Sequence, residues 1–135
     1  TTIQKLAQTR KQIKVVDDQT GAPTSARAIA ESTTHILGQG LNAGTTKSSI
    51  FSHPGIFHMS CGGKTNWFGF AKIILKLSGL SEGTEVTPIH TSEYPTLATR
   101  PKYSLLSNKK LTQVFLYEMP PWHDALQECL GYAPK

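Results

Sequence analysis

Two glycines, a lysine and a threonine stand together in SCGGKT, residues 60–65, and this combination could bind a phosphate. A phosphate-binding loop has the form G-x-x-x-x-G-K-[ST], in which the backbone and the lysine surround the phosphates. The first position of that pattern is His58 here, and no later strand ends in an obvious magnesium-binding aspartate. We therefore expect a turn that leads into a capped helix, and no nucleotide triphosphatase.

Metal binding and acid–base catalysis are the next chemistries to consider. His58 and Cys61 have the spacing of half a zinc site, but no second pair of ligands follows, so we predict no metal site. His58 is expected to be an ordinary histidine of a strand. Asp17 and Asp18 are adjacent acids, and neighbours on a strand point to opposite faces. Turn formation ahead of Gly21 is therefore their expected role.

Catalytic motifs are missing from the chain. It has no G-x-G-x-x-G fingerprint for a dinucleotide and no G-x-S-x-G elbow. It also has no Tyr-x-x-x-Lys pair, in which the lysine would lower the pKa of the tyrosine. The residues alone therefore assign no catalytic and no cofactor-binding position.

The hydrophobic pattern predicts an α/β chain with few short strands and flanking helices. Helices are expected over residues 2–11, 26–37, 67–77 and 122–129, with a short one after Ser107. Strands are expected over residues 13–16, 55–60 and 86–91, the last held to an edge by Pro88. Thr24 or Ser25 and Thr65 or Asn66 are candidate N-caps, and Gly79 is expected to end its helix. Residues 38–49 are rich in Gly, Ser and Thr, which predicts a mobile surface loop.

Composition limits the class of protein and its partners. The 135 residues suit one domain, but 38% hydrophobic and 17% charged residues suggest a loop-rich piece of a larger fold. A formal charge of +5 favours anionic partners, yet the basic residues are scattered, so nucleic acid is not expected. No apolar run approaches the roughly 18 residues that span a bilayer, so no membrane partner is expected. Without a signal peptide we expect a cytoplasmic protein whose Cys61 and Cys129 are reduced.

Four segments together resemble the C-terminal half of the dTDP-4-dehydrorhamnose reductases, a family of extended short-chain dehydrogenases/reductases. They are VVDDQTGAPTSARAIA, GIFHMSCGGKTNWFGFAKII, TSEYPTLATRPKYSLLSNKKL and MPPWHDAL. They occur in the family's order and cover most of the chain. The resemblance implies the C-terminal part of a Rossmann-like reductase, with residues 1–135 as its substrate-binding portion.

The same resemblance implies how the activity is divided. In that family an N-terminal Rossmann half binds NADPH and carries the catalytic Thr, Tyr and Lys, and this chain contains none of that half. We therefore expect the chain to be inactive alone and to have the missing half and a dTDP-sugar as partners. The parent would reduce the C4 ketone of dTDP-4-dehydro-L-rhamnose to dTDP-L-rhamnose. Apolar surface left by the missing half could cause the chain to associate with itself.

Six residues are expected on the substrate side, the first five from the turn and the last from the R-P segment: Gln19, Thr20, Gly21, Pro23, Thr24 and Arg100. Ligands of open α/β folds bind beyond the carboxyl ends of strands, and DDQTGAPT stands at such an end, directly before a helix N-terminus. Gln19 is expected at the pocket rim, without close packing. Arg100 resembles the family's arginine that pairs with the sugar-nucleotide diphosphate, for which a guanidinium is suited. A purely structural turn and a solvated arginine remain open alternatives.

Functions other than that of a reductase remain open alternatives. Relatives of the fold serve as non-catalytic regulatory or nucleotide-sugar-binding modules, and a free-standing protein of unrelated function is the third possibility. Some family members hold magnesium at a dimer interface with acidic side chains. Arg27 and Tyr132 stand at the matching positions here, and neither can replace a carboxylate, so no metal is expected.

Overall fold

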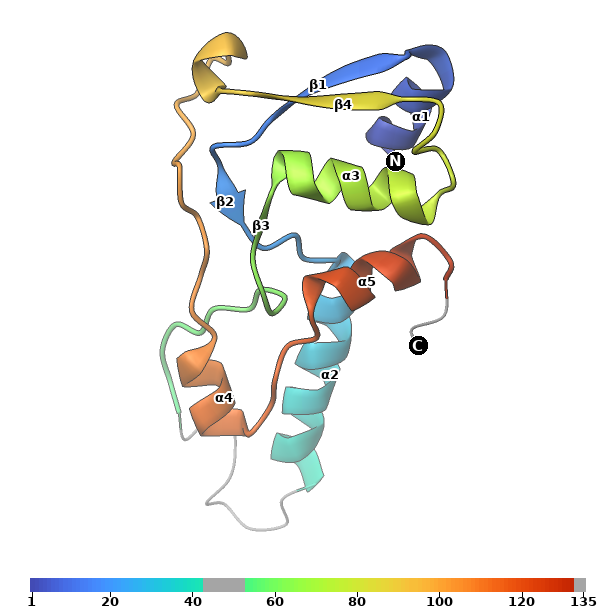
Figure 1. Ribbon diagram of the computed structural model, residues 1–135. Helices are drawn as coiled ribbons and strands as arrows, with labels where there is room; N and C mark the ends of the chain where they lie inside the picture. Colours follow the sequence, from blue (N-terminus) through green and yellow to red (C-terminus); the bar gives the residue numbers. More distant parts are fainter. Residues whose placement is uncertain (43–52, 133–135) are drawn as a thin grey trace.

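The computed structural model describes residues 1–42 and 53–132. A small two-stranded sheet with helices α1 and α3 forms one part, and helices α2, α4 and α5 form the other (Figure 1). The elements in chain order are α1 (Thr2–Thr9), β1 (Gln12–Val16), β2 (Thr20–Gly21), α2 (Ala26–Asn42), β3 (Thr65–Asn66), α3 (Trp67–Leu77), β4 (Glu85–Ile89), the 3₁₀ turn η2 (Thr91–Glu93), α4 (Lys109–Phe115) and α5 (Trp122–Cys129). Among the described residues no helix is long and apolar enough to cross a membrane.

Strands β1 and β4 pair in parallel, from Gln12 opposite Glu85 to Val16 opposite Ile89. Helix α3 lies against this sheet, as Figure 1 shows, and it contributes three almost fully buried residues, Ala71, Ile74 and Leu75. Their spacing of three and four places them on one helical face. The sheet and α3 thus bury each other's apolar side.

The two outer edges of this sheet differ. Glu85 donates its backbone N–H to the carbonyl of Lys11, and Asp17 donates to Ile89, so the odd-numbered residues of β4 face β1. Pro88 therefore lies on the outer edge of β4, where it has no N–H to offer a further strand. On the far side of β1, the backbone groups of Gln12, Lys14 and Val16 pair with no strand among residues 1–42 and 53–132. Only the β1 edge is suited to accept another strand.

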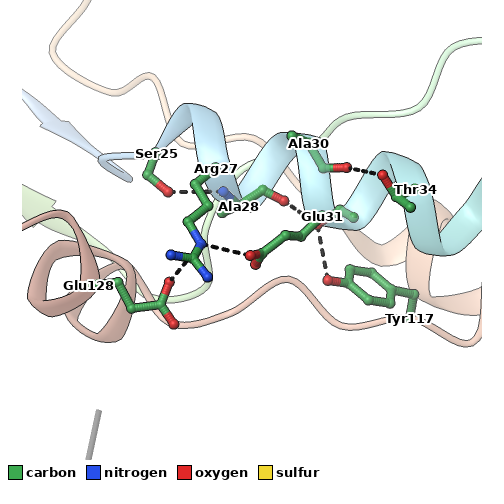
Figure 2. A network of polar contacts seen from close by, with 9 residues as sticks. Ser25, Arg27, Ala28, Ala30, Glu31, Thr34, Tyr117 and Glu128 are labelled. Atoms are coloured by element: carbon green, nitrogen blue, oxygen red, sulfur yellow. Dashed lines mark hydrogen bonds and ion pairs between the residues drawn. The ribbon is translucent and has the colours of Figure 1, made fainter. Parts of the chain in front are cut away.

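The second part has its own core around α2. Its buried residues come from four segments and are Ala28, Ile36, Cys61, Leu111, Met119 and Ala125. Ser32 is fully buried, and its hydroxyl satisfies its hydrogen bond within the helix by donating to the carbonyl of Ala28 at 2.6 Å. At the surface, Arg27 pairs with Glu31 within α2 and joins α2 to α5 through Glu128 (Figure 2).

Most predicted elements are present, and the caps are resolved. Ser25 rather than Thr24 caps α2, because its hydroxyl accepts from the N–H of Ala28 at 3.0 Å. Asn66 caps α3, and Gly79 follows that helix with a φ of +67°, a left-handed conformation that glycine adopts without strain. Pro121 is the N-cap of α5.

The predicted strand over residues 55–60 is wrong, because this segment is irregular. Side chains satisfy its backbone in place of a neighbouring strand. The Asn108 amide donates to the carbonyl of Ser60 at 2.5 Å and accepts from its N–H at 3.1 Å, and Thr24 accepts from the N–H of Cys61 at 3.0 Å. A short apolar run does not by itself distinguish a strand from such a segment.

The end of one helix and two short strands also differ from the prediction. Helix α2 continues to Asn42, so residues 38–42 are helical and not part of a loop, while residues 43–49 of that predicted loop lie outside the described residues. The two-residue strands β2 and β3 were not predicted, since two residues are too few to give an alternating pattern.

Replacing Asn66 by Ala should lower the free energy of unfolding by about 2 kcal/mol, from a lost cap and a lost tertiary hydrogen bond. Its oxygen accepts from the N–H of Gly69 at 2.7 Å, and its amide donates to the carbonyl of Asp17 at 2.6 Å. Urea unfolding followed by circular dichroism measures the change. Thr34→Ala is the control, because the exposed Thr34 hydroxyl bonds only within its own helix. Equal losses for both variants would contradict the role given to Asn66.

Candidate functional site

Three distant segments meet beyond the carboxyl end of β1. The turn that follows Val16 pairs with β3 through Thr20 opposite Asn66. Thr20 also donates its N–H to the carbonyl of Lys102 at 2.8 Å and accepts from the N–H of Ser104 at 2.9 Å. The turn therefore lies between the start of α3 and the segment that follows Arg100.

A small cavity of about 130 Å³ opens between these segments. Its lining residues are Gln19, Thr20, Gly21, Ala22, Pro23, Thr65, Asn66, Trp67, Phe70 and Ser104. Four of the six predicted site residues are among them. Glycine is favoured at position 21, because a Cβ there would lie 2.9 Å from the Ser104 hydroxyl. The cavity combines a polar turn with two aromatic rings from α3.

A larger cavity of about 410 Å³ follows β1 and α1. Its lining residues are Thr2, Ile3, Leu6, Ile13, Lys14, Val15, Val16, Gln19, Trp67, Tyr94, Thr96 and Arg100. Arg100 is exposed and lies at this cavity only. Gln19 and Trp67 line both cavities, so they form the boundary that the two share.

Thr24 is the one predicted site residue that lines neither cavity. Its hydroxyl donates to the carbonyl of Ala22 at 3.0 Å and accepts from the N–H of Cys61 at 3.0 Å. The first bond lies within the turn, and the second ties the turn to Cys61 in the core of the second part. The geometry gives Thr24 a structural task at this position.

The side chain of Gln19 is held by two hydrogen bonds. Its side-chain oxygen accepts from the indole N–H of Trp67 at 3.2 Å, and its amide nitrogen donates to the hydroxyl of Thr91 at 3.0 Å. Gln19 thus lines the cavities, as predicted for a rim position, and its amide is hydrogen-bonded on both sides. Trp67, which defines the boundary between the cavities, was not predicted as a site residue, because its helical spacing already explained it as a core position.

The two acids after β1 are not arranged as predicted. The strand ends at Val16, so Asp17 and Asp18 do not alternate across a sheet, and with His90 they place ligand-type atoms within 4.8 Å of one another. Asp18 accepts from both the hydroxyl and the N–H of Thr91, at 2.5 and 3.0 Å. The Thr91 hydroxyl lowers the pKa of Asp18 most, so this carboxylate is ionised at neutral pH.

The SCGGKT turn is engaged with its own chain. Gly62 donates its N–H to the carbonyl of Pro120 at 2.8 Å and accepts from Trp122 at 3.0 Å. Cys61 is 1% exposed, and its burial raises the pKa of its thiol, whereas His58 is exposed and belongs to no strand. The amide of Gly62 is therefore not available to a phosphate.

Arg27, which stands where the resemblance implies a magnesium ligand in some relatives, is paired within the chain. Its guanidinium contacts Glu31 and Glu128 (Figure 2). The distances are 2.7 Å to Glu31 and 3.8 Å to Glu128. The hydrogen bond that Arg27 donates to Glu31 raises the pKa of the guanidinium further. A permanent cation occupies this position.

Comparison with known families places the chain. Residues 1–133 match the family described as the RmlD substrate binding domain. The chain belongs to this family. As an RmlD substrate-binding domain, it places its turn and cavities beyond a strand end, the region in which open α/β folds bind ligands.

Individual relatives of this RmlD domain are reductases and a related protein. The chain is 38% identical to a dTDP-4-dehydrorhamnose reductase of Burkholderia thailandensis, over 96% of the chain and 44% of that protein. It is 35% identical to the spore coat polysaccharide biosynthesis protein SpsK of Bacillus subtilis, over 96% of the chain and 40% of that protein.

The fold has a match among solved structures. With a TM-score of 0.79 and 29% identity, the chain resembles a crystal structure of dTDP-4-dehydrorhamnose reductase from Bacillus anthracis in complex with NADP, over 94% of the chain and 40% of that structure. The predicted fold class, a partial Rossmann-like reductase, is confirmed. The chain spans less than half of the length of each of these relatives.

The two thiols should differ in reactivity. Cys129 is exposed and Cys61 is buried, with a raised thiol pKa that leaves less reactive thiolate at a given pH. An aromatic disulfide reagent at pH 8 should therefore modify one thiol rapidly and the second only after denaturant is added. In Cys129→Ser the rapid phase should vanish. Two rapid phases in the native protein would contradict the burial of Cys61.

Proposed function

We propose that this domain binds the sugar nucleotide in a full-length NADPH-dependent dTDP-4-dehydrorhamnose reductase. The match of residues 1–133 to the RmlD substrate-binding domain is the observation that carries the proposal. The similarity to reductases in sequence and structure supports it. The parent protein reduces the C4 ketone of dTDP-4-dehydro-L-rhamnose to the alcohol of dTDP-L-rhamnose. A cytoplasmic location belongs to the same proposal.

The substrate lies across the two cavities in this proposal. Gln19 and Thr20 offer hydrogen bonds at the smaller cavity, and Gly21 and Pro23 shape its wall. Arg100, at the larger cavity, pairs with the diphosphate, because a guanidinium donates two parallel hydrogen bonds to phosphate oxygens. Gln19 belongs to both cavities and contacts the ligand between its two ends.

The missing Rossmann half docks at the open edge of β1. The backbone groups of Gln12, Lys14 and Val16 suit a further parallel strand, and parallel sheets are normally covered on both faces. The larger cavity, apolar along Ile3, Leu6 and Val15, adjoins this edge. In the isolated domain the same edge is available to a second copy, so self-association is part of the proposal.

NADPH is assigned to that missing half. A dinucleotide-binding turn requires glycines directly after a strand. β1 is followed by Asp17, Asp18 and Gln19, so the residues of this chain do not fit such a turn. None of them is assigned to the cofactor.

The isolated chain should show no reductase activity, whereas the full-length protein should oxidise NADPH when dTDP-4-dehydro-L-rhamnose is added. The absorbance of NADPH measures both. Activity of residues 1–135 alone would contradict the assignment of the chemistry to the missing half. An inactive full-length protein that still binds dTDP-sugars would favour the alternative, a non-catalytic nucleotide-sugar-binding module. An upstream reading frame without Tyr-x-x-x-Lys would favour it too.

Arg100→Ala in the full-length protein should weaken sugar-nucleotide binding about tenfold, as expected for a charged hydrogen bond. Binding of NADPH should change little, because no contact of Arg100 with the cofactor is proposed. Arg10→Ala is the matched control, since Arg10 is an exposed arginine that lines neither cavity. Calorimetric titration with dTDP and with NADPH separates the two effects. Equal weakening of both ligands would contradict a diphosphate contact.

A further inference from the structure

A continuous chain of hydrogen bonds runs from the boundary of the two cavities to the carboxylate of Asp18. The indole N–H of Trp67 donates to Gln19 at 3.2 Å, and the amide nitrogen of Gln19 donates to the Thr91 hydroxyl at 3.0 Å. That hydroxyl donates to Asp18 at 2.5 Å, and the Thr91 N–H donates to the same oxygen at 3.0 Å. The chain thus connects the turn after β1 with α3 and η2, and only its first two members line both cavities.

The direction of every bond in this chain is fixed by its two ends. An ionised carboxylate only accepts and an indole N–H only donates. The Thr91 hydroxyl must therefore give its proton to Asp18, which leaves a lone pair for the NH₂ group of Gln19. The oxygen of Gln19 must then face Trp67. The opposite orientation of the amide would direct its NH₂ group at the indole N–H and its oxygen at a hydroxyl without a free proton.

This direction determines what Gln19 offers to a ligand. After its two internal bonds, Gln19 retains one N–H and one oxygen lone pair. A sugar hydroxyl, which both donates and accepts, complements that pair. Trp67 is 53% exposed with its N–H already used, so it offers the ring rather than a donor. A sugar presents both features, hydroxyl groups and an apolar face of C–H groups.

We propose that Asp18 and Thr91 are positioning residues, which orient Gln19 and Trp67 toward a sugar ring at the boundary of the two cavities. The inference rests on the proposed function. Neither residue lines a cavity, so neither touches the ligand. His90, 3.8 Å from the second oxygen of Asp18, lies outside the chain of bonds because it is exposed and has no contact with Gln19.

Thr91→Val in the full-length protein tests this proposal, because valine keeps the shape of threonine and removes only the hydroxyl. The KM for the sugar nucleotide should rise about tenfold, the effect of a lost hydrogen bond that orients the contacts. The kcat and the KM for NADPH should stay within about twofold of the native values, because a twofold change corresponds to less free energy than one hydrogen bond contributes. Thr91→Ser restores the hydroxyl and should restore most of the affinity.

The matched control is Thr87→Val, in the strand β4 that precedes Thr91. Thr87 also bonds a glutamine amide, that of Gln12 at 3.0 Å, but neither residue lines a cavity. Both valine variants should lose similar melting temperature, and only Thr91→Val should raise the sugar-nucleotide KM. Asp18→Asn is the second variant. The new amide can donate to the Thr91 hydroxyl and thereby reverse the donor–acceptor direction of the hydrogen bonds. This variant should therefore raise the KM for the sugar nucleotide and leave the KM for NADPH unchanged.

Three outcomes would overturn the proposal. The sugar-nucleotide KM of Thr91→Val could equal that of Thr87→Val, or Thr91→Ser could fail to restore it, or both substrates could lose affinity equally as the melting temperature falls. In each of these cases the native enzyme is active and only the positioning role fails. A native full-length protein that neither reduces nor binds the dTDP-sugar would instead reject the proposed function, and this inference with it.

Discussion

The side chain of Asn66 makes the connection on which both the sheet and the site depend. One amide caps α3 through the N–H of Gly69 and at the same time donates to the carbonyl of Asp17, directly after β1. The helix that buries the sheet therefore begins at the point where the strand ends. A Cβ at position 69 would lie 3.1 Å from the capping oxygen and 2.8 Å from the Thr65 hydroxyl, which explains why a glycine follows the cap. Through this amide, α3 fixes the position of the turn that forms the cavities.

Side chains also replace backbone pairing at several other points of the described chain. Asn108 satisfies Ser60, Thr24 satisfies Cys61, and the Thr84 hydroxyl donates to the carbonyls of Ala7 and Arg10. Such contacts hold a chain whose regular sheet has only two strands. They leave the outer edge of β1 without a strand partner among the described residues, beside a cavity that Ile3, Leu6 and Val15 help to line.

Within the site, some residues are held in place by hydrogen bonds, whereas others are exposed to solvent. Thr20 is held by backbone bonds to Lys102 and Ser104, and Gln19 by its two side-chain bonds, so little conformational entropy is left for a ligand to remove. Arg100 is exposed, and a flexible guanidinium at the larger cavity can adapt to a charged group. In the proposed function, the ordered turn contacts the sugar ring and the exposed arginine contacts the diphosphate.

The sequence by itself determined the family, the α/β class, five helices and the turn that lines the smaller cavity. It could do so because helical periodicity, capping residues and the DDQTGAPT run are local patterns, in which the conformation depends on residues that are close in sequence. It failed over residues 55–60, where Asn108 supplies the partner that a strand would need. Only the tertiary structure decided that Gln19 bonds Thr91, 72 residues away, that Trp67 lines two cavities, and that Thr24 bonds the backbone of Cys61. Hydrogen bonds between residues far apart in sequence depend on the tertiary fold, and the spacing of residues along the sequence does not predict which of them lie close together in space.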